Sequence, residues 1–285
     1  MGNSMSLDTA IFALIYLASA YSLFWLGKVV FDLIHREFKV NEELLQKDNA
    51  ALAISLAGYY FGLVLVIGGA IVGPSAGLVD DLIDIFLYGL LAIVLLNIST
   101  VINNRLILYR FDNTTEIIRD QNVGTGVVVS ATYIATGLIL FGAISGEGGT
   151  IWTALAFWGL GQVALVIVSL LYERITPYSI HEHIERNNVA VGVAFAGALI
   201  GMGNILRYAV SGDFESWNAN LTTFGLYAAI GLVALPLIRI ATDKILLPGA
   251  SMAAELVEQE RPNLGAAYII MFSYIGSSFI IGWCL

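Results

Sequence analysis

The residues in this chain best suited to chemistry are His181 and His183, which flank Glu182. A structural or catalytic metal needs several side chains that converge on one point. A spacing of two residues sends the two imidazole rings to different sides of a helix, and no third credible ligand accompanies them. We therefore expect no metal site and no bound cofactor.

Other enzyme signatures are also incomplete. Gly146-Glu-Gly-Gly149 is not followed by the Lys and Ser or Thr that complete a phosphate-binding loop. No Ser, His and Asp constellation recurs at one depth of the apolar segments described below. The sequence therefore predicts a protein that is not an enzyme.

Charged and amide groups at the ends of apolar segments are the remaining candidates for chemistry. Each has a basic neighbour within four residues or beside it, which is typical of paired charges that reach toward water. If these groups face inward instead, they form a vestibule that selects cations. This boundary set comprises Asp32, Asn104, Glu173 and Asp243.

Arg207 is the one basic residue toward the far end of an apolar segment, with Asn204 one turn before it. An ionisable residue inside a membrane is a functional candidate by default. Three more residues would bring it to the interface, where Asp213 or Glu215 could pair with it. Both interpretations remain open at this stage.

The composition identifies the solvent in which these groups must be positioned. The chain is 58% hydrophobic and only 12% charged, with a mean hydropathy of +0.82, which excludes a water-soluble globule. A membrane-spanning helix needs about 20 apolar residues. We find eight such runs, at residues 9–28, 50–72, 82–103, 123–144, 151–172, 189–210, 221–241 and 264–285.

The basic residues predict the orientation of these spans. Apart from Arg207, the Lys and Arg residues all lie at or between the end of an odd-numbered span and the start of the next. The opposite loops carry acidic residues and no basic ones. Because cytoplasmic loops are enriched in Lys and Arg, the four basic connectors should be cytoplasmic and both termini outside.

A repeat of two helices organises the whole chain. A Glu-bearing polar connector, an Asn and a small-residue apolar helix recur four times, in units 1–72, 73–145, 146–212 and 213–285. Since each unit crosses the membrane twice, all four should point the same way. The sequence predicts an all-α polytopic protein with four parallel repeats in two four-helix modules, 1–145 and 146–285.

The repeated Asn stands where each even-numbered helix begins, so its side chain can cap an unpaired backbone N–H. Four such Asn residues and four helix N-termini at one depth would also form a partly positive ring for an anionic headgroup or partner. The positions are Asn49, Asn122, Asn188 and Asn263.

Small residues follow each Asn at fixed distances and form a stripe one helical turn apart, which lets neighbouring backbones approach closely. We expect the even-numbered helices to form an inner, tightly packed bundle with the odd-numbered helices outside. In a functional interpretation the stripe lines a narrow path. It comprises Gly58, Gly62, Ala131, Ala135, Gly197, Gly201 and Gly276, with Phe272 as an exception.

The segment YERITPYSIHEHIERNNVAVGVAFAGALIG, residues 172–201, resembles the core signature of the DUF350 (UPF0719) family of bacterial inner-membrane proteins. Asp48-Asn49-Ala50-Ala51 and Asn188-Val189-Ala190-Val191 resemble its Asp-Asn-Pro-Ala-Val-Ala consensus. The second and fourth units depart from it, with Gln121 before the Asn and Arg261-Pro262-Asn263. The resemblance implies a multi-pass inner-membrane protein, often encoded near envelope-stress proteins of the phage-shock type, with no characterised activity.

Two classes of function follow. The first is a non-enzymatic envelope component that acts through its cytoplasmic connectors, with the lipid bilayer and a cytoplasmic or membrane protein as partners. The second is a channel or transporter for a small ion or metabolite along the repeat axis. The net charge of -9 is spread over loops on both sides, so we expect no nucleic-acid partner. The oligomeric state is left open.

Overall fold

The computed structural model describes residues 7–249 and 251–285 as helices joined by short loops, with no strand in these ranges. Eight of the described helices are long and apolar enough to cross a membrane, which confirms the all-α polytopic fold class. They are α1 (Leu7–Ile34), α3 (Ala50–Val72), α4 (Leu78–Ile102), α6 (Val123–Ile144), α7 (Ile151–Ile175), α9 (Val189–Val210), α10 (Trp217–Ala241) and α11 (Leu264–Cys284).

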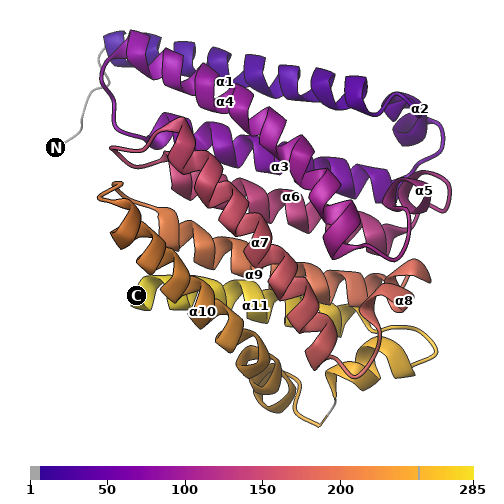
Figure 1. The fold of residues 1–285 in the computed structure, drawn as a ribbon. Helices are drawn as coiled ribbons and strands as arrows, with labels where there is room; N and C mark the ends of the chain where they lie inside the picture. The colour runs from indigo at the N-terminus through magenta and orange to yellow at the C-terminus, as the bar shows by residue number, and fades with distance from the viewer. Residues whose placement is uncertain (1–6, 250) are drawn as a thin grey trace.

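Short helices occupy the four polar connectors. They are α2 (Val40–Leu45), α5 (Asn113–Ile118), α8 (Ile180–Glu185) and the π-helical turn η3 (Ala254–Glu258). Helices α4 and α10 continue into π-helical turns, η1 (Asn103–Ile107) and η2 (Thr242–Leu246). All four connectors lie at one end of the molecule, here called the connector end, and α11 ends at the opposite end (Figure 1).

The second connector helix is capped by a different residue from the one that its sequence spacing suggests. The spacing Asn113-Thr-Thr-Glu116 predicts that Asn113 caps the second connector helix. The cap is Asp112 instead, whose side chain accepts from Thr115 N at 2.7 Å, while Asn113 lies inside the helix and is buried. In the third connector, Ser179 caps α8 and accepts from Glu182 N at 3.4 Å.

The long helices form two layers. Helices α3, α6, α9 and α11 lie side by side in a row, here called the Asn row, and α1, α4, α7 and α10 lie across them (Figure 1). The row is open, with α3 at one end and α11 at the other. The even-numbered spans of the sequence analysis, which form the Asn row, therefore pack on one another in a line and do not form the inner bundle expected from the sequence.

Small residues bring the helices of the Asn row close together. A Cβ added to Gly62 would lie 2.8 Å from Tyr133 O of α6, and one added to Gly201 would lie 2.9 Å from Tyr274 O of α11. Gly58 faces Ser130 and Gly197 faces Met271 in the same way. Gly276 differs, because its nearest neighbours are atoms of Phe272 on its own helix.

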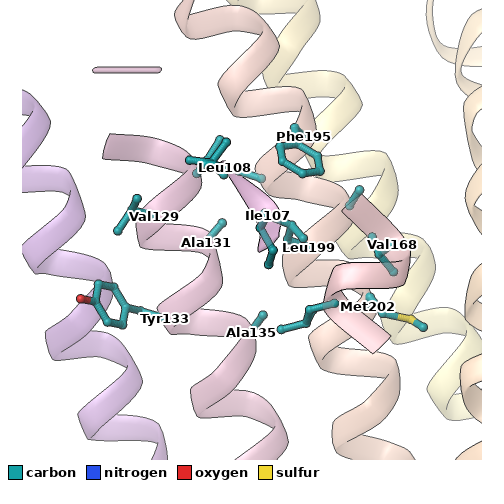
Figure 2. Packing of buried hydrophobic residues seen from close by; sticks show 14 of the residues in the cluster. Ile107, Leu108, Val129, Ala131, Tyr133, Ala135, Val168, Phe195, Leu199 and Met202 are labelled. Atoms are coloured by element: carbon teal, nitrogen blue, oxygen red, sulfur yellow. The ribbon is translucent and has the colours of Figure 1, made fainter. Parts of the chain in front are cut away.

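The core lies between the two layers and is continuous along the row. Ala131 and Ala135 of α6 and Leu199 and Met202 of α9 belong to one buried cluster (Figure 2). Helix α9 is the most enclosed span, because it has α6 and α11 on its flanks and α7 and α10 across it. The edge helices α1 and α10 leave most of their surface open, as expected where lipid is the solvent.

Candidate functional site at the connector end

The four repeated Asn residues stand at the N-caps of the Asn-row helices. In each, the side-chain oxygen accepts a hydrogen bond from the backbone N–H three residues on, at 3.0 to 3.1 Å. The caps are Asn49 on α3, Asn122 on α6, Asn188 on α9 and Asn263 on α11.

The side-chain nitrogen of the same Asn binds the connector of the following unit. Asn49 Nδ2 donates to Ile117 O at 2.9 Å, and Asn122 Nδ2 donates to Ile184 O at 2.7 Å. Asn188 Nδ2 donates to Leu256 O at 2.8 Å. We call these three hydrogen bonds the clips. Each of these three Asn residues therefore caps its own helix and holds the next connector, so the four connectors are linked in series.

A carboxylate from the connector completes the environment of three Asn residues. Asn49 Nδ2 donates to Glu43 Oε2 at 3.2 Å, and Asn122 Nδ2 donates to Glu116 Oε2 at 2.7 Å. Asn263 Nδ2 donates to Glu255 Oε2 at 2.7 Å. The third unit lacks this bond among the described contacts. There, Glu182 pairs with Arg186 at 2.7 Å on the exposed face of α8.

The pKa values of the two enclosed carboxylates are shifted in opposite directions, because only one of them has a basic hydrogen-bond partner. Burial opposes ionisation of Glu43, but hydrogen bonds from Lys47, at 2.6 Å, and Asn49 hold its pKa below the usual value. Burial raises the pKa of Glu116, and the bond from Asn122 only partly offsets it. Arg119 pairs with Asp120 instead.

The residue before each Asn has a left-handed backbone in the first three units. Asp48, Gln121 and Asn187 have φ of 51°, 49° and 57°. This region is costly for most residues, and short polar side chains tolerate it best. Pro262 precedes the fourth Asn and cannot adopt positive φ, which explains why that junction is built differently.

The boundary set is positioned at the base of the connectors. Asp243 Oδ1 accepts from Met252 N at 2.8 Å, and Asn104 Oδ1 accepts from Asn113 Nδ2 at 2.7 Å. Asp32 pairs with Lys28 at 2.7 Å, the basic neighbour that the sequence suggests. Apart from Asp32, these groups therefore hold their own connectors.

Glu173 collects three donors from the third connector. Its carboxylate accepts from Ile180 N at 3.0 Å and from Ser179 Oγ at 3.2 Å, and His181 Nδ1 lies 3.2 Å from it. His181 is buried, and its Nε2 lies 2.8 Å from Ile107 O. Both ring nitrogens thus have protein partners in the described structure.

Arg207 belongs to a polar chain near the opposite end of the molecule. Its Nε donates to Asn204 Oδ1 at 3.0 Å, and Asn204 Nδ2 donates to Ser278 Oγ of α11 at 3.0 Å. The guanidinium lies 4.1 Å from the centre of the Tyr208 ring. Asp213, one suggested partner, accepts from Glu147 N at 2.9 Å. The sequence did not predict the Asn204–Ser278 hydrogen bond between α9 and α11, because the two residues are far apart along the chain.

Comparisons with known proteins give the family. The family described as Domain of Unknown Function (DUF350) matches the chain twice, at residues 5–144 and 148–285. A UPF0719 transmembrane protein of Aquifex aeolicus (strain VF5) is 27% identical over 266 residues, which cover 91% of this chain and 96% of that protein. The UPF0719 transmembrane protein YshE of Bacillus subtilis (strain 168) is 26% identical over 126 residues, 44% of this chain and 87% of that protein. No solved structure matches. The chain is therefore a membrane protein that belongs to the DUF350 family, with two copies of the family's domain in sequence.

Proposed function

We propose that this protein is a non-enzymatic component of the bacterial inner membrane that binds a protein partner through its connector end, as part of the response to envelope stress. The observation that carries the proposal is the series of clips. Because Asn49, Asn122 and Asn188 each hold the connector of the next unit, and Asn49 also binds Glu43 of α2, the helices α2, α5, α8 and η3 are held as one extended surface.

The exposed part of this surface has mixed charge, which suits a polar protein partner. Asp48 and Asp120 are exposed at the first two junctions, and Glu185 and Arg186 at the third. Both signs occur, so the surface does not favour a polyanion or an anionic membrane face. Such surfaces recognise partners by charge complementarity.

The arrangement of the repeats gives less support to transport along a repeat axis. A path along that axis requires the four units to surround a common space. The Asn-row helices lie in a line instead, with α3 and α11 at its two ends (Figure 1). Polar residues that line a substrate path would have to lie elsewhere in the molecule.

Photocrosslinking in intact cells tests the proposal. A photoreactive amino acid replaces Glu185 on α8 or, as a matched control, Glu147 in the loop between α6 and α7 at the opposite end. We expect one discrete protein adduct from position 185 and none from position 147. Combining the photoreactive residue with Arg186→Glu should weaken the adduct. Equal adducts from both positions, or none from position 185, would reject the proposal.

A further inference from the structure

A cavity marks the connector end of the first module. It has a volume of about 40 Å³ and lies between the ends of α1 and α4 and the start of α6. Phe31, Phe38, Thr100 and Tyr133 are among its lining residues. Two of its hydroxyl groups bond to each other, because Thr100 Oγ1 donates to Tyr133 Oη at 2.7 Å.

The repeat places a more polar set of side chains at the same location in the second module. Tyr172 corresponds to Phe31, since each directly precedes a boundary residue. Arg239 corresponds to Thr100, four residues before the boundary residue, and Tyr274 corresponds to Tyr133, eleven residues after the Asn. The Tyr172 and Tyr274 rings meet edge to face, with centroids 5.9 Å apart.

Tyr178, in the loop that leads to α8, completes this set, which we call the Arg239 cluster: Tyr172, Tyr178, Arg239 and Tyr274. The three hydroxyl oxygens and Arg239 Nη1 are all buried, and none forms a hydrogen bond of full geometry within the described residues. Tyr172 interacts weakly with Tyr274, and Tyr178 with Arg239. Tyr172 and Tyr274 are only 0% and 1% exposed. The charge of Arg239 acts on all three tyrosines.

The chemistry of the four groups indicates what they would bind. A guanidinium can only donate hydrogen bonds, and a neutral phenol donates one. Burial raises the pKa of Tyr178, so its hydroxyl keeps its proton at neutral pH. The phenol oxygens can also accept, but the guanidinium cannot, so the set has more donors than acceptors and a fixed positive charge, which favours an added acceptor that carries negative charge.

Two carboxylates, Asp243 and Glu173, act on this set, and neither fills this role, because Glu173 accepts from the third connector as described above. Asp243, four residues after Arg239, turns Oδ1 to Met252 N at 2.8 Å, and it forms no ion pair with Arg239 in the described structure. The near-complete burial of Tyr172 and Tyr274 excludes a group as large as a lipid phosphate with its chain.

We propose that the Arg239 cluster is a binding site for a small inorganic anion of the size of chloride, between α7, α10 and α11. The site belongs to the second module alone, because Phe31 and Thr100 replace two of its donors in the first. Asp243 lies close by and weakens anion binding through repulsion.

Thermal unfolding of the purified full-length protein in detergent tests the proposal. Sodium chloride or bromide replaces sodium gluconate at constant ionic strength. We expect a saturable rise in Tm with halide. Arg239→Gln should raise the half-saturating halide concentration by about tenfold or more. Tyr274→Phe should also raise this concentration but leave the protein folded, since it removes one oxygen atom. Asp243→Asn should lower the half-saturating halide concentration, because it removes a repelling charge.

Tyr133→Phe is the matched control, because it removes the equivalent hydroxyl in the first module, where Thr100 is the partner. Its halide response should equal that of the unmodified protein. An unsaturable response, no response, or an equal response in Tyr274→Phe would overturn the proposal. A bromide-containing crystal that shows no anomalous peak beside Arg239 would do the same and would leave water as the occupant.

Discussion

A single Asn side chain carries out two tasks at each junction, and Asn122→Asp separates them. The carboxylate can still cap α6, but it cannot donate to Ile184 O and it faces the buried Glu116. We expect a loss of about 1–3 kcal/mol in the free energy of unfolding, measured by denaturant titration in detergent.

Asn263→Asp is the control for this experiment. Asn263 caps α11 and is exposed, and its side-chain nitrogen donates to Glu255 of its own connector instead of to another unit. The same substitution should therefore cost less than about 1 kcal/mol at this position. Equal losses at Asn122 and Asn263 would show that the clip contributes nothing, because both variants keep the cap and only Asn122 forms a clip.

The two buried carboxylates predict opposite responses to pH. The pKa of Glu43 is lowered, so its contribution to stability is present above its ordinary value of 4.5 and is lost as the pH falls through the folded value. The pKa of Glu116 is raised, so its contribution is present below 4.5 and is lost as the pH rises through the folded value.

Substitution by Gln, which does not ionise, tests these signs. At pH 7 Glu43→Gln should lower Tm because the Lys47 ion pair is lost, whereas Glu116→Gln should leave Tm unchanged or raise it. Both differences should shrink near pH 4. Melting curves at several pH values measure this contrast, and a drop in Tm of the same size for both variants at pH 7 would contradict it.

At the scale of helices, equivalent glycines in the repeat differ in what they face. Gly201→Ala places a Cβ 2.9 Å from Tyr274 O, so α9 and α11 must move apart at a cost of about 1–3 kcal/mol. Gly276→Ala, at the same repeat position of α11, meets only Phe272 of its own helix and should be neutral or slightly stabilising. Unfolding in detergent distinguishes them, and equal effects would contradict the row packing.

The helices also show where sequence reasoning succeeded. The limits predicted for the even-numbered spans agree with α3, α6, α9 and α11 to within one residue, because Asn caps mark their starts. The odd-numbered spans, which correspond to α1, α4, α7 and α10, form longer helices than predicted. Helix α1 continues through Lys28 and Asp32 to Ile34, because these charges pair on one face and do not break the helix.

The arrangement of the repeats and the clips could not be predicted from the sequence. Parallel repeats with small-residue stripes can close into a bundle or extend as a row, since the choice depends on the rotation between units, which no local pattern encodes. The clips join residues more than 60 positions apart, such as Asn122 and Ile184. A capping Asn has a spare amide nitrogen, and this was the one signal that a second partner existed.

At the scale of the whole molecule, the row puts every connector at one end, and the distribution of basic residues predicts that this end is cytoplasmic. The prediction can be tested in a Cys284→Ser background, since Cys284 is the only cysteine in the sequence. Single cysteines at Asp48, Asp120 and Glu185 should all resist a membrane-impermeant thiol reagent in intact cells, because each follows or lies in a connector.

A cysteine at Glu147, in the loop between α6 and α7, should react with the same reagent before the cells are opened. Opening the cells should then make all the connector positions reactive, which shows that they are exposed as in the structure.

The side on which the connector cysteines react bears on more than the orientation of the protein. If the connector cysteines reacted in intact cells, the surface held together by the clips would face outward, and the partner that we propose would have to be an extracytoplasmic one. If successive connectors reacted on alternating sides, consecutive units could not share a clip, because Asn49 and Ile117 must lie on the same side of the membrane to be 2.9 Å apart.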